Sequence, residues 1–232
     1  MNIIGLDACK SGWCGIGEVN AKLIWGCFKN LSELLEVYPD LQRILIDIPI
    51  GLSSKNFNRS IDAKARTYLK YRKSSIFSPP CREAIFADNY KEALRINKSI
   101  CGKGISIQAY NISQKTKEID LWIDQKPESI KILEAHPELC FKTLNENQDL
   151  ELSKHDKAGI EERKSILFDR DKNLKSIYED LMNEYKRSQV KPDDILDAMA
   201  LYLINLDSLT LKYFEDDNNV DETGKWVRIV YG

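Results

Sequence analysis

The sequence predicts an α/β fold built on a mixed β-sheet. Short apolar segments come first along the chain, a basic and mainly helical segment follows, and one more apolar segment precedes a run of helices. Such an order is typical of proteins in which helices cover the faces of a sheet. The 232 residues, 43% hydrophobic and 30% charged, suffice for a core without disulfides or a structural metal.

The first three predicted strands form an antiparallel meander. Residues 2–7 are short and apolar, and residues 13–19 and 22–29 flank a tight turn at Asn20 and Ala21. Residues 2–7 lack a basic lead and a cleavage-like site, so we expect a strand rather than a signal peptide. We therefore expect a cytoplasmic protein whose six cysteines are free thiols. No apolar stretch approaches the roughly 20 residues of a membrane helix, and we expect no membrane partner.

Alternating helices and strands follow the meander. Residues 30–37 are predicted to form a helix that ends before Pro39. Residues 43–48 are apolar on both faces, which suits a strand in the buried middle of a sheet. Further strands are predicted at residues 130–134 and 226–231. Two prolines make residues 74–82 a predicted loop. The remaining predicted helices are residues 62–73, 90–97, 109–124, 137–144, 156–168, 174–187 and 192–206.

The net charge of −2 hides an uneven distribution. Residues 53–117 contain 14 lysines and arginines against four acids, a net charge of +10, and the rest of the chain carries −12. A basic segment on an acidic body can bind anions beside an acidic site, but solvated helix faces would give the same count. We expect a single domain, residues 1–232, with a basic, mainly helical insertion at residues 53–128.

Four carboxylates occupy positions where burial is expected. Asp7 and Glu134 end apolar strands, Asp47 lies within one, and Asp197 lies in a helix that is apolar nearly all round. An isolated buried carboxylate costs several kcal/mol unless it is paired, hydrogen-bonded or metal-bound. Convergence on Mg²⁺ or Mn²⁺ would explain all four, because carboxylate oxygens without thiolates or histidines favour these ions. Asp194, three residues before Asp197, can face the same edge of the sheet.

Three of these acids also have a purely structural explanation. Asp47 could cap the turn before Pro49, and Glu134 could accept a backbone N–H. Asp194 lies in the first turn of its helix, where the helix dipole stabilises a negative charge. That explanation fails for Asp197, which lies beyond the first turn.

These residues resemble a known layout. A strand ending in Asp before a hairpin, a second acid on the strand after the first helix, and an acid in a late helix are similar to the ribonuclease H-like fold. The chain more closely resembles a bacterial and archaeal family of predicted ribonuclease H-like nucleases, catalogued as a domain of unknown function. The segments that carry this resemblance are residues 5–13, 47–52, 74–77 with Pro80 and Arg82, 102–106, 134–138 and 194–198.

The resemblance implies a three-layer α/β fold with a mixed five-stranded sheet and a helical insertion. It also implies a metal-dependent nuclease in which two Mg²⁺ or Mn²⁺ ions catalyse phosphodiester hydrolysis. Asp7, Asp47, Glu134 and Asp197 would be catalytic ligands, with Asp194 as a further metal ligand. The resemblance further implies that the protein binds nucleic acid, of a type that the sequence does not determine.

Cationic residues near the predicted site are candidates for binding that polyanion. Lys10 follows Asp7 closely, Arg82 lies in the proline-rich loop, and Lys103 lies between two glycines. His136, two residues after Glu134, could orient a water or ligand, or be hydrogen-bonded into the turn before Pro137.

Two other functions stay open at the level of the sequence. An actin-like, nucleotide-binding phosphotransferase also begins with a strand, an Asp and a glycine-containing hairpin, although no second phosphate-binding hairpin is visible. The acidic net charge would also fit a non-catalytic binding module on the same fold. Exposed apolar surface on the insertion could also support a homodimer.

Overall fold

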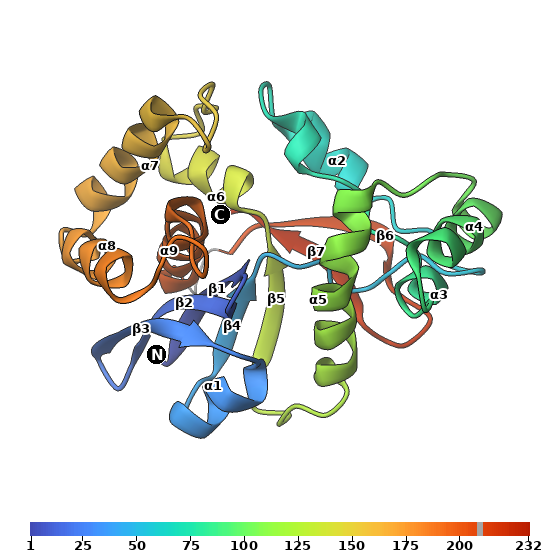
Figure 1. Ribbon diagram of the computed structural model, residues 1–232, viewed down its shortest axis with the longest axis horizontal. Coiled ribbons are helices and arrows are strands. Elements are labelled where there is room, and N and C mark those ends of the chain that lie inside the picture. The colour runs from blue at the N-terminus through green and yellow to red at the C-terminus, as the bar shows by residue number, and fades with distance from the viewer. Residues whose placement is uncertain (208–210) are drawn as a thin grey trace.

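The computed structural model describes residues 1–207 and 211–232, and it has the α/β class with a mixed sheet that the sequence predicts (Figure 1). Its strands lie in the order β3-β2-β1-β4-β5-β7-β6. β1, β4, β5 and β7 are parallel, and β2, β3 and β6 pair antiparallel with their neighbours. The strands are β1 (Ile3–Cys9), β2 (Gly12–Val19), β3 (Lys22–Phe28), β4 (Arg43–Ile46), β5 (Lys131–Ala135), β6 (Tyr213–Val220) and β7 (Trp226–Val230).

Within the described residues the sheet has seven strands rather than the expected five. β7 coincides with the apolar segment predicted at residues 226–231, whereas β6 is a strand that the sequence does not predict. Its sequence, Tyr-Phe-Glu-Asp-Asp-Asn-Asn-Val, has almost no alternation of apolar and polar residues. β6 lies at the edge of the sheet beside β7, with a register shift between Glu215 and Val220. An edge strand of this kind buries little apolar surface and so leaves a weak pattern.

The helices largely follow the predicted segments. The predicted helix at residues 62–73 ends at Tyr68, and a one-turn helix, α3, was not predicted because a single turn has no periodic pattern. The helices are α1 (Leu31–Val37), α2 (Ile61–Tyr68), α3 (Arg82–Ile85), α4 (Tyr90–Cys101), α5 (Ile107–Ile123), α6 (Pro137–Leu144), α7 (Lys157–Arg170), α8 (Asn173–Glu184) and α9 (Pro192–Leu206), with a 3-10 turn, η1 (Lys73–Ser75). No helix in the part of the chain that the structure describes is long and apolar enough to cross a membrane.

Two helical layers cover the sheet. On one face, α9 and the helices α6 to α8 pack on a core that includes Ile3, Leu45 and Leu133. On the other face, α1 and α5 pack on a core that includes Ile4 and Ile44. Neighbouring residues of one strand therefore serve different cores, as the two-residue period of a strand requires.

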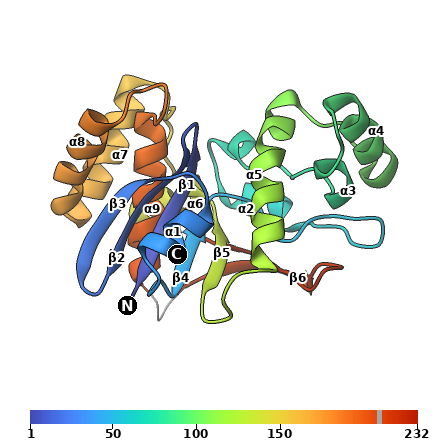
Figure 2. The ribbon, with the colours of Figure 1, turned by 60° about the horizontal axis from the view of Figure 1, so that its bottom comes forward.

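The segment between β4 and β5 carries α2 to α5. It projects from the β7–β6 side of the sheet (Figure 2). Ile61 and Ala65 of α2 pack against Val227 and Ile229 of β7. The helices α3, α4 and α5 share a smaller core of their own. The chain thus forms a three-layer body with a helical lobe beside it.

α9 lies very close to β1, and Gly5 makes this possible. A Cβ atom built on Gly5 would lie 2.5 Å from the carbonyl oxygen of Ala198 and closer still to the amide nitrogen of Tyr202. Both are backbone atoms of α9, so rotation of a side chain cannot relieve the clash. The absence of a side chain at Gly5 thereby places α9 directly over the end of β1 that carries Asp7.

We expect Gly5→Ala to destabilise the protein. The added methyl must push α9 away from β1, and such overpacking costs about 1–3 kcal/mol. Urea denaturation of the variant and the wild type measures this difference in the free energy of unfolding. Gly104→Ala is the matched control, because its Cβ would meet only the Leu94 side chain at 3.5 Å among the described residues. Equal stability of the two variants would contradict the assigned contact between β1 and α9.

Candidate active site

Three acidic side chains converge where β1, β4 and α9 meet. Asp7 lies on β1 between Gly5 and Cys9, on the face that α9 covers. Asp47 directly follows β4, two residues after Leu45 on that same face, and its N–H donates to the carbonyl of Leu6 (3.1 Å). Asp197 lies within α9 and is almost fully buried. The three residues come from distant parts of the chain, so only the fold brings them together.

The shifts in pKa show that these carboxyl groups interact. Burial raises the pKa of Asp7 well above its ordinary value, and the nearby negative charges of Asp197 and Asp47 raise it further. Burial together with Asp197 raises the pKa of Asp47 to about 7. Like charges in one poorly solvated site disfavour full ionisation. The site therefore contains more negative charge than its surroundings balance.

Lys154 supplies part of the missing positive charge. Its Nζ donates to the Oδ2 of Asp197 (2.5 Å) and lies 4.0 Å from the Oδ2 of Asp193. Burial opposes the charge of Lys154, yet Asp197 and Asp7 hold the pKa of its ammonium above its ordinary value. The other oxygen of Asp197, Oδ1, is buried and has no hydrogen-bond partner among the described residues.

The donor set fits a hard divalent cation. All three side chains offer carboxylate oxygens, their mutual repulsion would be relieved by a cation, and Oδ1 of Asp197 lacks a partner within the described chain. Within residues 1–207 and 211–232, no group of three or more His, Cys, Asp and Glu side chains is placed so that it could hold a metal ion by itself. Mg²⁺ is usually bound by one or two carboxylates, waters and substrate phosphates rather than by a closed protein cage. One or two of Asp7, Asp47 and Asp197 would hold it together with such waters and phosphates.

Asp194 lies at the margin of this cluster. Its Oδ2 accepts a hydrogen bond from the N–H of Lys191 (2.9 Å), which caps the first turn of α9. Burial and the charges of Asp193 and Asp197 raise the pKa of Asp194 to about 6, although the Lys191 N–H opposes this shift. Its charge also contributes to the raised pKa of Asp7. The structure thus gives Asp194 a capping role within reach of the cluster's electrostatic field.

Glu134 is not brought together with the three aspartates. It pairs with Ile46 in the β4–β5 register, on the sheet face opposite to Asp7. Its carboxylate accepts hydrogen bonds from Arg59 (Nη2 to Oε1, 2.5 Å; Nη1 to Oε2, 2.9 Å) and from the N–H of Ile50 (2.7 Å). Arg59 also pairs with Asp62 at 2.8 Å, and all three side chains are buried. Glu134 therefore holds the loop after β4 against the start of α2.

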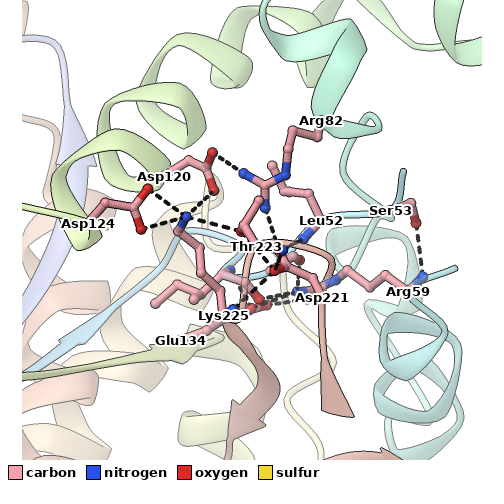
Figure 3. A network of polar contacts seen from close by, with 12 residues as sticks. Leu52, Ser53, Arg59, Arg82, Asp120, Asp124, Glu134, Asp221, Thr223 and Lys225 are labelled. Carbon is pink, nitrogen blue, oxygen red and sulfur yellow. Dashed lines mark hydrogen bonds and ion pairs between the residues drawn. The ribbon is translucent and has the colours of Figure 1, made fainter. Parts of the chain in front are cut away.

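Arg82 likewise forms ion pairs within the protein. Its guanidinium donates to Asp120 of α5 and to Asp221 of the β6–β7 hairpin (Figure 3). Lys225 joins the same network through Asp124 (2.9 Å) and Asp120 (3.7 Å). These contacts tie the helical lobe to the edge of the sheet.

His136 is held by the backbone around the start of α6. Its Nδ1 accepts a hydrogen bond from the N–H of Glu138 (3.2 Å), and its Nε2 lies 3.3 Å from the carbonyl of Ser75. Burial lowers the pKa of His136. A neutral ring with Nε2–H facing the Ser75 carbonyl satisfies both contacts.

Lys10 and Lys103 have exposed side chains. Lys10 is in the β1–β2 turn and borders a small depression with Asp194 and Gln189. The neighbouring N–H of Ser11 donates to the carbonyl of Gln189 (3.3 Å), so this amide is not free to bind a phosphate as in a nucleotide-binding hairpin. Lys103 borders a second depression within the helical lobe, beside Gly104 and Ser106.

A cavity of about 380 Å³ adjoins the carboxylate cluster. Asp47, Lys154 and Glu138 line it from the three-layer body, and Arg72, Phe77 and Ile112 line it from the lobe. Of the residues proposed from the sequence, Glu134 and His136 also reach this cavity. It gives a ligand access to the aspartates.

Sequence reasoning did not identify Lys154, Arg59 or Arg72. Lys154 lies in a loop with no motif around it, and its role arises only from contact with α9. Arg59 and Arg72 belong to the basic segment at residues 53–117, but nothing in the sequence separates them from exposed lysines nearby. The excess of positive charge in that segment was the one available signal.

Comparison with known proteins finds a protein family whose model matches the chain. The family model described as "Protein of unknown function (DUF429)" matches residues 5–207, which is most of the chain. No curated protein and no solved structure matches the chain.

The raised pKa of Asp47 predicts a pH-dependent effect of Asp47→Asn in the metal-free protein. Between about pH 4 and pH 7, the folded state keeps a proton that the unfolded chain releases, so wild-type stability falls as the pH rises. The asparagine of the variant cannot ionise. We therefore expect the difference in the free energy of unfolding between the variant and the wild type to shift in favour of the variant as the pH rises. The expected shift is on the order of 1–3 kcal/mol between about pH 5 and pH 8.

Urea denaturation in EDTA at both pH values measures this difference. Asp88→Asn, which alters an exposed carboxylate outside the cluster, serves as the control. Parallel pH profiles for Asp47→Asn and the wild type would show that Asp47 is not in the unbalanced site described above.

Replacing Arg59 should strongly destabilise the protein. Arg59→Met leaves Asp62 and Glu134 buried without their counter-charge, which costs about 3–5 kcal/mol. The combined variant Arg59→Met, Asp62→Asn, Glu134→Gln should recover part of this loss, because it leaves no charge in this group. Lys164→Met, which removes a surface pair with Glu161, should change stability by less than about 1 kcal/mol. Thermal and urea unfolding distinguish these cases, and equal losses in both single variants would contradict the buried ion pair.

Proposed function

The chain belongs to the DUF429 family of proteins of unknown function, and we propose that it is a metal-dependent nuclease with a ribonuclease H-like fold. The observation that carries the proposal is the meeting of Asp7, Asp47 and Asp197 in one buried, electrostatically coupled site. Glu134 and Glu138, which are also buried, have arginine partners. The three aspartates instead have Lys154 beside them and, among the described residues, an unpartnered oxygen on Asp197.

The position of the acids supports the choice of fold. The first three strands form an antiparallel meander, and β4 and β5 continue the sheet in parallel with β1. One acid lies on β1, the second follows β4, and the third lies on a late helix that crosses β1. This is the layout that the sequence resemblance implies for ribonuclease H-like proteins.

The chemistry of the site suits hydrolysis of a phosphodiester. Bound Mg²⁺ or Mn²⁺ polarises phosphoryl oxygens and lowers the pKa of a bound water. One or two of Asp7, Asp47 and Asp197 would hold the cation, and the burial of Asp7 and Asp197 keeps bulk water from screening its charge. Lys154 brings an ammonium to the same place, where it can balance the charge of a scissile phosphate.

The surroundings supply the affinity for a polyanion. The segment at residues 53–117, with its net charge of +10, forms most of the helical lobe on one side of the cavity. A positive field beside an acidic, cation-binding centre draws nucleic acid toward the site.

We expect the wild-type protein to cleave nucleic acid in the presence of Mg²⁺ or Mn²⁺. Asp7→Asn should lower the rate about 100-fold or more, because a lost metal ligand removes several kcal/mol of transition-state stabilisation. Gel assays with single-stranded, duplex, hybrid and branched substrates test this, with Asp88→Asn as the control.

Calorimetric titration with Mn²⁺ separates the two ways in which the assay can fail. Mn²⁺ binding that disappears in Asp7→Asn, with no cleavage of any substrate, would retain the metal site and refute the nuclease. Absence of both would make the carboxylate cluster structural and favour a non-catalytic binding module.

A further inference from the structure

We infer that the cavity beside the carboxylate cluster binds one unpaired nucleotide, so that the substrates are single strands or unpaired ends rather than continuous duplex. This inference rests on the proposed function and specifies its substrate class. The cavity is bounded by the three-layer body on one side and by the helical lobe on the other. Because Asp47 and Lys154 line it, a nucleotide inside it has its phosphate next to the proposed site of hydrolysis.

The size of the cavity favours a single nucleotide. Its volume of about 380 Å³ lies near the lower end of the roughly 300–1,000 Å³ typical of small-molecule sites. Enzymes that take a base into such a pocket must unpair it first, and this costs least for a base that is already single-stranded.

The lobe presents an aromatic side chain for stacking. Phe77 lines the cavity and is 38% exposed, so that its ring is accessible to a base. Ile112 and Pro49 provide further apolar surface around the same cavity. Aromatic rings stack on bases of any sequence, with about 1–3 kcal/mol per base.

Arg72 is the cation best placed to bind a phosphate next to that base. Its Nη2 donates to the Oγ of Ser153 at 3.4 Å, and its Nε is buried without a hydrogen-bond partner in the described part of the chain. Its backbone has φ of 57°, a left-handed conformation that is uncommon for residues with a side chain and often found at ligand-binding positions. Ser74 and Ser75, next in the chain after Lys73, also line the cavity, and the Ser75 hydroxyl donates to the carbonyl of Arg72 (2.7 Å).

Arginine partners reduce the repulsion between a phosphate and the other acids of the cavity wall. Asp62 and Glu134 share Arg59, and Glu138 pairs with Arg163 at 2.8 Å. Of the cavity-lining acids that the structure describes, Asp47 is the one that belongs to the cluster with Asp7 and Asp197. Arg72 therefore gives the wall a positive part for the sugar–phosphate, and Asp47 gives it an acidic part for the metal-assisted step.

Fluorescence anisotropy with labelled single strands of DNA and RNA about 12 nucleotides long, and with blunt duplexes of equal length, tests the inference in buffer containing Ca²⁺. We expect the single strands to bind at least about tenfold more tightly than the duplexes, because unpairing a base costs a few kcal/mol. Phe77→Ala should weaken single-strand binding about 5- to 150-fold, the equivalent of about 1–3 kcal/mol of stacking. Phe77→Trp should retain binding, and Arg72→Gln should weaken it.

Two matched controls lie outside the cavity. Phe86 has the same exposed fraction, 38%, and Arg95 is an exposed arginine on α4. Phe86→Ala and Arg95→Gln should leave single-strand binding within about twofold of the wild type, as surface substitutions away from a site do. Equal binding of duplex and single strand, or equal effects of Phe77→Ala and Phe86→Ala, would overturn the inference.

Cleavage of the same substrates separates this inference from the proposed function. Hydrolysis of single strands that is slowed by Phe77→Ala supports both. Internal cleavage of continuous duplex that is insensitive to Phe77→Ala overturns the single-nucleotide cavity and leaves the nuclease intact. Single-strand binding that depends on Phe77, without hydrolysis in Mg²⁺ or Mn²⁺, supports the cavity and refutes the nuclease.

Discussion

Repulsion between buried carboxylates is the interaction on which the candidate site depends. Asp7, Asp47 and Asp197 lie in one poorly solvated place, and Lys154 balances only part of their charge. Such an arrangement is unfavourable for folding unless a ligand compensates for it. The packing of α9 on Gly5 maintains it nonetheless, because moving Asp197 away from Asp7 would require the helix to leave the sheet. The fold thereby tolerates unfavourable repulsion between carboxylates at the proposed site of phosphodiester hydrolysis.

Other buried carboxylates of the protein have arginine partners. Arg59 pairs with both Asp62 and Glu134, Arg163 pairs with Glu138, and Arg82 bridges Asp120 and Asp221, the last of which is drawn in Figure 3. Each of these pairs joins segments that are distant in sequence or anchors a loop. Buried pairs of this kind add little net stability, but breaking one is costly, so the pairs of Arg59 and Arg82 hold the helical lobe in one position against the sheet. A cavity wall formed by two parts of the chain needs such a fixed position.

Glu134 and Asp47 illustrate what could be predicted from the sequence and what could not. Both lie at the ends of apolar strands, and the sequence treats them alike. In the sheet, Ile46 pairs with Glu134, and since successive residues alternate between faces, Asp47 and Glu134 point to opposite sides. Both faces of β4 and β5 are apolar, so no hydrophobic alternation in the sequence reveals this difference. Register is a property of the assembled sheet.

The sequence by itself determined the α/β class, most of the helices and strands, and a set of four candidate acids that includes the three that meet, because local apolar periodicity and the cost of burying a charge act on short segments. Tertiary structure alone decided that Asp7, Asp47 and Asp197 share a site, that Glu134 pairs with Arg59, and that Lys154 approaches Asp197. It also revealed β6, which is polar because it lies at an edge. These features arise from contacts between residues far apart in the chain, and such contacts leave no periodic trace in the sequence.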